Sequence, residues 1–137
     1  MKKVIKNVLN EEEAKFLIKN PTDETILKKI KNIINDEIGP IDWERPSYTR
    51  VEHNGKHLWH FDTGAKGNYA EKGHMEWCEY GCSILLTQGE CGFLEYRDGT
   101  KLNHFLDLAI HSSDEEHKIT DYKGERITFL AFVRTLK

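Results

Sequence analysis

The segment that begins at Asn54 places a histidine and a carboxylate two positions apart, at His60 and Asp62. Asn-Gly at its start favours a type I′ hairpin turn, because both central residues of that turn need positive φ. On the strand expected over residues 56–62, alternate side chains share a face, so His60 and Asp62 point the same way. Together they can bind one metal ion, and a third ligand would complete a two-histidine, one-carboxylate site with open positions for substrates. Two side chains that only hydrogen-bond to each other on a solvated face would give the same pattern.

The third ligand must come from another strand, and the sequence has seven histidines in all. His111 and His117 flank an acidic loop, and the residues after His117 are typical of a strand, a glycine turn and a second strand. Such a hairpin lets His117 and Arg126 face one cavity, with Thr128 on the face of Arg126. A buried arginine needs an anionic partner, and its planar fork matches a carboxylate. A surface arginine on a terminal strand is the plain alternative.

The cysteines give a competing metal site and indicate the compartment. Three cysteines cannot pair without leaving one over, which favours the reducing cytoplasm. His74, Cys78 and Cys82 have a spacing that would suit zinc on a helix, but the residues around Cys82 are typical of a strand. Buried thiols acting as small apolar side chains are therefore the favoured interpretation.

Composition limits the class of protein. The 137 residues have a mass of 16.0 kDa and fit a single domain over residues 1–137. Twenty Lys and Arg against 23 Asp and Glu give a net charge of −3, which argues against a nucleic-acid partner. No apolar run approaches the roughly 18 residues of a membrane span, so no membrane partner is expected. The sequence leaves the oligomeric state open.

Helices come first along the chain and strands follow. Asn10 can cap a helix that ends at Asn20, and Pro21-Thr22 opens a second helix that Gly39-Pro40 ends. These elements make up a supporting region over residues 1–40, before a β core over residues 46–135. Seven strands are expected, over residues 47–53, 56–62, 80–87, 92–97, 105–111, 116–121 and 125–135. This order predicts an antiparallel sandwich or barrel braced by helices. The long stretch at 63–79 is typical of a functional loop.

The chain resembles the iron(II)- and 2-oxoglutarate-dependent oxygenases, most nearly their prolyl 4-hydroxylase-like branch, over about residues 48–134. His60-Phe61-Asp62 is similar to the family's H-x-D iron motif. Residues 91–96 are similar to its central turn and strand, except that Cys91 replaces the first glycine of a pair.

The end of the chain adds to this resemblance. His117, Gly124 and Arg126 are placed like the family's distal iron histidine, turn glycine and cosubstrate anchor, and Arg126 with Thr128 fits its R-x-S/T pair. Many prolyl 4-hydroxylases have lysine at the position of Arg126. Tyr48 is the candidate for the family's cosubstrate tyrosine. A two-residue hairpin loop would turn Tyr48 outward, whereas a three-residue loop would place it opposite the first histidine ligand.

The resemblance implies a mainly β fold with N-terminal helices, a distorted double-stranded β-helix (a cupin-like jelly roll) with the helices outside its major sheet. It implies that His60, Asp62 and His117 bind Fe(II), and that Arg126 and Thr128 bind 2-oxoglutarate as cosubstrate. O2 would be the oxidant, and ascorbate is a further candidate cofactor. The reaction would hydroxylate a C–H bond of a peptide, protein or small molecule, with peptidyl proline as first candidate, and release succinate and CO2. The alternative is a cupin-like module that binds a metal or ligand without catalysis.

Overall fold

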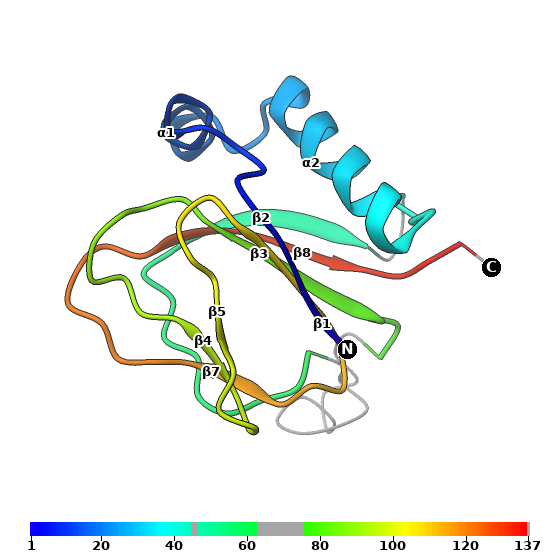
Figure 1. The fold of residues 1–137 in the computed structure, drawn as a ribbon. Helices are drawn as coiled ribbons and strands as arrows, with labels where there is room; N and C mark the ends of the chain where they lie inside the picture. Colours follow the sequence, from blue (N-terminus) through cyan, green and yellow to red (C-terminus); the bar gives the residue numbers. More distant parts are fainter. Residues whose placement is uncertain (45–46, 63–75, 137) are drawn as a thin grey trace.

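The computed structural model describes residues 1–44, 47–62 and 76–136, and this part of the chain folds into two helices and two antiparallel sheets. Figure 1 shows both helices on one side of the large sheet and the small sheet on its other side. The elements are β1 (Lys2–Ile5), α1 (Glu11–Lys19), α2 (Glu24–Ile38), β2 (Tyr48–His53), β3 (Tyr80–Leu85), β4 (Leu94–Tyr96), β5 (Lys101–Leu102), β6 (Leu108–Ser112), β7 (His117–Ile119) and β8 (Ile127–Val133).

Local capping determines where the helices begin. The Asn10 side chain accepts a hydrogen bond from the Glu13 amide at 2.8 Å, and the Glu13 carboxylate accepts one from the Asn10 amide at 3.0 Å, which confirms the predicted cap of α1 as a capping box. The second helix begins at Glu24 rather than at the predicted Pro21-Thr22, because the carboxylate of Asp23 caps its first turn. Neither described helix has the length and apolarity needed to cross a membrane.

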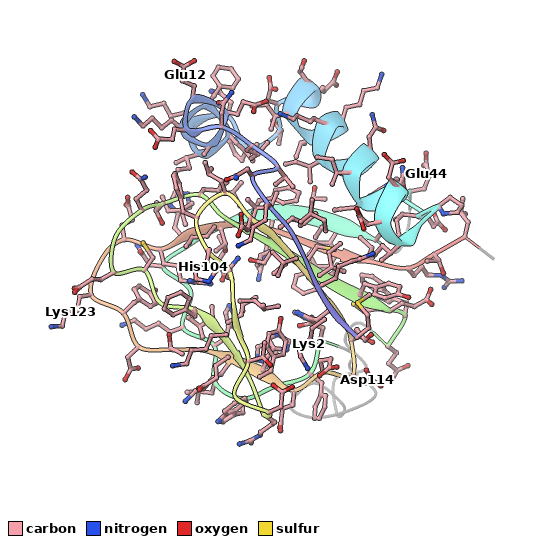
Figure 2. All side chains as sticks on the ribbon, in the orientation of Figure 1. Lys2, Glu12, Glu44, His104, Asp114 and Lys123 are labelled. Atoms are coloured by element: carbon pink, nitrogen blue, oxygen red, sulfur yellow. The ribbon has the colours of Figure 1, made fainter. Side chains whose placement is uncertain are left out.

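The main core lies between the helices and the large sheet. Ile30 and Ile34 of α2 have no exposed surface, and they belong to one apolar cluster with side chains of β3, β6 and β8. Burial of this stripe holds α2 on the outer face of the sheet, as its helical spacing predicted. Charged residues such as Glu12 and Lys123 point away from the body of the molecule (Figure 2).

The strand order is β1-β6-β3-β8-β2 in the large sheet and β5-β4-β7 in the small one. The two sheets form the mainly β, distorted double-stranded β-helix that the sequence led us to expect. A smaller apolar cluster of Leu94, Tyr96 and Ala109 joins β4 to β6. Side chains that point between the sheets are therefore shielded by both of them.

The predicted hairpin at Asn54-Gly55 is wrong. β2 pairs with β8, from Tyr48 opposite Phe132 to His53 opposite Ile127, and residues 56–62 form no strand beyond a single bridge at His60. The reason is that Asn54 bonds to Arg126 instead of turning the chain back on itself. Its amide donates to the Arg126 carbonyl at 2.5 Å, and its side-chain oxygen accepts from the Arg126 amide at 2.9 Å. Neither register considered for Tyr48 therefore occurs.

The predicted hairpin between residues 116–121 and 125–135 is also wrong. β7 pairs with β4 in the small sheet, whereas β8 pairs with β3 and β2 in the large sheet. The intervening residues thus cross from one sheet to the other. β1 and β5 were not predicted, and the remaining strands lie at or within a few residues of their predicted positions.

Candidate active site

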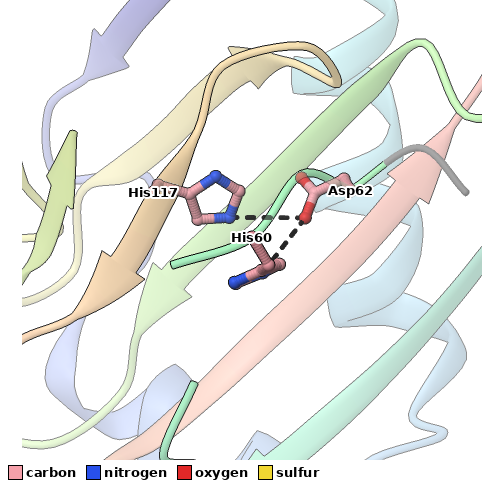
Figure 3. Close-up of side chains that lie close together, drawn as sticks. All are labelled: His60, Asp62 and His117. Carbon is pink, nitrogen blue, oxygen red and sulfur yellow. Dashed lines mark ion pairs between the residues drawn. The ribbon is translucent and has the colours of Figure 1, made fainter. Parts of the chain in front are cut away.

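His60, Asp62 and His117 meet between the two sheets. Their ligand atoms all lie within 4.8 Å of one another. Asp62 Oδ1 is 3.3 Å from His117 Nε2 and 3.6 Å from His60 Nε2, as the dashed lines in Figure 3 indicate. A β-bridge holds the two histidines, because each backbone amide donates to the carbonyl of the other at 2.9 and 3.0 Å.

The outer ring nitrogens of both histidines are occupied by backbone carbonyls. His60 Nδ1 is 2.6 Å from the Leu58 oxygen, and His117 Nδ1 is 2.7 Å from the Glu115 oxygen. A carbonyl only accepts, so each Nδ1 carries a hydrogen and each Nε2 is directed at Asp62 Oδ1. When both rings offer their Nε2 lone pairs, three electron-pair donors converge on one point, where a bound cation offsets their mutual repulsion. This donor set fits a divalent metal ion of the two-histidine, one-carboxylate type.

Asp62 is ionised at this position although it is only 2% exposed. Burial opposes the charged form, but His111, His117 and His60 outweigh burial and hold the pKa of Asp62 well below its usual range. The carboxylate is therefore available as an anionic ligand.

His111 contacts this carboxylate, a role that the sequence pattern did not predict. Its Nε2 lies 2.5 Å from Asp62 Oδ2, and its Nδ1 lies 2.8 Å from the hydroxyl of Tyr96. A signal was present: His111 is the polar residue that follows three apolar residues in the buried part of β6, and its partner in β3 is Gly81. A glycine inside a strand often marks a close approach of other groups.

Arg126 is 1% exposed, and its guanidinium donates hydrogen bonds to three neutral acceptors of the described residues. Nη1 donates to the carbonyls of Cys91 at 2.9 Å and Gly92 at 3.1 Å, and Nη2 donates to Asn103 Oδ1. These bonds use three of the five guanidinium N–H groups, so Nε–H and one Nη2–H remain for another acceptor. Within the described residues, Nε is the buried side-chain nitrogen or oxygen that lacks any partner. An unsatisfied buried donor on a cation fits a carboxylate ligand.

A cavity of about 220 Å³ joins these groups. It is lined by the three candidate metal ligands and by Arg126 and Thr128. The structure therefore brings all five predicted site residues to one cavity, although the two hairpins expected to do so do not form. Fe(II) and the distal carboxylate of 2-oxoglutarate are both compatible with these side chains.

Tyr48 also lines the cavity, and its ring packs on Phe132 at 5.3 Å and on Trp77 at 6.0 Å between centroids. Of the alternative zinc cluster, His74 lies outside the described residues. Cys78 and Cys82 are buried, and burial raises the pKa of both thiols, which keeps them protonated. This supports the interpretation of both cysteines as apolar side chains.

The fold is shared with solved 2-oxoglutarate oxygenases. A viral collagen prolyl hydroxylase from Paramecium bursaria Chlorella virus-1, in a 2-oxoglutarate complex, aligns with a TM-score of 0.72 at 13% identity, over 99% of this chain and 96% of that one. A Pseudomonas putida prolyl-4-hydroxylase aligns with a TM-score of 0.67 at 12% identity, over 99% and 88%. A 2OG-Fe(II) oxygenase family protein from Burkholderia pseudomallei gives 0.51 at 15% identity, over 80% and 56%. No family model and no curated sequence matches the chain. At these identities the likeness shows the fold, and it confirms the double-stranded β-helix.

Proposed function

We propose that this chain is an Fe(II)- and 2-oxoglutarate-dependent dioxygenase, a hydroxylase in a single domain over residues 1–137. One observation carries the proposal: the ligand atoms of His60, Asp62 and His117 converge in a cavity that also contains Arg126, a buried cation with an unpartnered donor. A metal alone would require only the first three residues. The buried arginine adds an anion-binding group at the same cavity, which is what a dicarboxylate cosubstrate needs.

Each residue has a distinct task in this proposal. His60, Asp62 and His117 would hold Fe(II), and their carbonyl-bound Nδ1 atoms keep both rings oriented. Arg126 and Thr128 would bind the distal carboxylate of 2-oxoglutarate. When bound, the metal supplies O2 activation and C–H oxidation, with 2-oxoglutarate converted to succinate and CO2. The two sheets keep water from the buried ligands.

The proposed substrate is a peptidyl proline. Its support is the fold shared with the viral collagen prolyl hydroxylase and the bacterial prolyl-4-hydroxylase. The alternative is a small-molecule substrate, which a comparison of a proline-containing peptide with free proline distinguishes from peptidyl proline. The compartment proposed from the cysteines is the cytoplasm, where reducing conditions keep iron ferrous.

The deciding experiment is an anaerobic titration of the purified chain with Fe(II) and then 2-oxoglutarate. We expect the visible charge-transfer band of a metal-chelated 2-oxo acid, and succinate formation once O2 and ascorbate are added. His117→Ala should abolish both signals. His104→Ala is the matched control, since His104 is exposed, packs on Phe93 and is not among the residues that line the triad cavity.

Two results would contradict the proposal in different ways. No band at saturating Fe(II) would exclude the proposed site. A band without any succinate after O2 is added would favour the cupin-like binding module.

Once turnover has been established, the substrate is tested by comparing a Pro-Pro-Gly repeat peptide with free proline by mass spectrometry. A 16 Da increase on the peptide supports peptidyl proline, and one on free proline alone contradicts it.

A further inference from the structure

We propose that His111 is a positioning residue for Asp62, and that Tyr96 fixes the orientation of His111. This inference rests on the proposed function, because it concerns how the candidate ligand Asp62 is held. It adds two residues that neither the H-x-D motif nor the distal histidine identifies.

The two oxygens of Asp62 face different partners. Oδ1 faces His117 Nε2 at 3.3 Å and His60 Nε2 at 3.6 Å, on the side where a metal would bind. Oδ2 faces His111 Nε2 at 2.5 Å. A carboxylate only accepts, so His111 must donate from Nε2. The donation occupies Oδ2 and leaves Oδ1 for the metal, which favours binding through one oxygen.

Tyr96 completes a chain of hydrogen bonds that links the two sheets. The Tyr96 hydroxyl lies 2.8 Å from His111 Nδ1 and forms a hydrogen bond with it. Tyr96 is 1% exposed and belongs to β4, where it lies opposite His117 in β7. Burial raises the pKa of the Tyr96 hydroxyl, which keeps it protonated. The hydrogen bonds from Tyr96 and Asp62 hold the two ring nitrogens of His111 and therefore set one ring orientation.

Gly81 provides the space for this arrangement. It is paired with His111 between β3 and β6. A Cβ added at Gly81 would overlap Asp62 Oδ2 and would lie 2.6 Å from His111 Nε2. Real Cβ atoms do not approach that closely, so a side chain here would push the carboxylate and the imidazole apart.

His111 differs from the two candidate ligand histidines in its use of nitrogen atoms. His60 and His117 each bond a carbonyl through Nδ1 and direct Nε2 toward Asp62 Oδ1, on the side of the candidate metal site. Both nitrogens of His111 are already engaged, one by Asp62 and one by Tyr96. It therefore has no lone pair for a metal and acts through Asp62.

Cobalt(II) is the probe for the test, because its visible absorption reports ligand geometry and binding can be measured without turnover. We expect His111→Phe to weaken Co(II) binding by roughly ten- to a hundredfold, the usual effect of losing a group that orients a metal ligand. His111→Gln should recover most of this loss, since its amide can donate near the original Nε2 position. Gly81→Ala should weaken Co(II) binding and shift the Co(II) spectrum in the same direction as His111→Phe.

Tyr96→Phe provides the readout that separates positioning from simple packing. It should weaken Co(II) binding in the wild-type background and have no further effect in the His111→Phe background, because its contribution passes through His111. Equal losses in both backgrounds would overturn the role of Tyr96. If His111→Phe does not fold, the Co(II) affinity of Tyr96→Phe is compared in the wild-type and His111→Gln backgrounds. An affinity equal to that of the wild type in both backgrounds would then overturn the inference.

The possible failures are distinguishable. Wild-type protein that binds no Co(II) and no Fe(II) would contradict the proposed function itself. Wild-type and His111→Phe proteins that bind Co(II) equally well would overturn the inference and leave the proposed function intact. His111→Gln as weak as His111→Phe would show that a donor to Asp62 does not account for the loss, and would also overturn the inference.

Discussion

Replacing Arg126 by lysine tests the proposed cosubstrate site most directly. In the structure Arg126 uses three N–H groups on Cys91, Gly92 and Asn103, and Nε–H and one Nη2–H remain for a ligand. A lysine keeps the charge but has three donors at a single nitrogen. If two of them serve the carbonyls of Cys91 and Gly92, one donor remains for the distal carboxylate where arginine offers two. Losing one charge-assisted hydrogen bond costs about 1.5–3 kcal/mol, or roughly ten- to a hundredfold in 2-oxoglutarate affinity.

The assay is calorimetric binding of 2-oxoglutarate to metal-loaded protein without O2. The comparison ligand is 2-oxopentanoate, which has a methyl group where 2-oxoglutarate has its distal carboxylate. Arg126→Lys should weaken 2-oxoglutarate and leave 2-oxopentanoate and the metal affinity nearly unchanged. Arg126→Ala is a poorer variant, because it would also remove the hydrogen bonds that Arg126 donates to the Cys91 and Gly92 carbonyls and to Asn103. Equal weakening of both ligands, or a change of less than twofold for 2-oxoglutarate, would refute the assignment of Arg126.

Two more predictions follow from the structure. His60→Ala, Asp62→Ala and His117→Ala should each abolish Fe(II) binding or turnover, since each removes one of the converging ligands; full activity in any of the three would show that the triad is wrongly assigned. Glu13→Gln keeps an acceptor for the capping box but loses its charge, and hydrogen bonds from Lys29 and the Asn10 amide lower the pKa of Glu13. The Glu13 charge therefore stabilises the folded state at pH values above the ordinary glutamate pKa. The contribution is at most about 1 kcal/mol, because solvent screens the site. This advantage should disappear as pH falls through the lowered pKa, which urea unfolding across pH 3–7 can check.

Features that depend on nearby residues could be predicted from the sequence. The cap at Asn10 and the helical spacing of Ile30 and Ile34 are local patterns, and both elements form. The pairing of His60 with Asp62 is also local, because two positions along an extended chain return to the same side. The prediction that His60 and Asp62 point to the same side is correct, even though residues 56–62 make only one bridge instead of a regular strand.

The hairpins failed because turn propensity does not decide which strand becomes the partner. Asn-Gly is a strong turn signal, but Asn54 forms two hydrogen bonds to Arg126, 72 positions away, and these extend the β2–β8 ladder. The Gly turn before Arg126 likewise connects the two sheets instead of folding β7 onto β8. In both cases strand pairing between segments distant in the sequence outweighed a short-range turn preference.

The same distinction explains why the sequence pointed to ligands and not to the residues that hold them. A ligand is recognised by its type and spacing, whereas a positioning residue is defined by the register between strands. His111 reaches Asp62 across 49 positions only because β6 pairs with β3 so that Gly81 lies opposite His111. A shift of one residue would move His111 to the other face and place a side chain against the carboxylate. A metal site built on this triad therefore depends on the register of the large sheet as much as on the three ligands, and Gly81→Ala tests that dependence without changing a ligand.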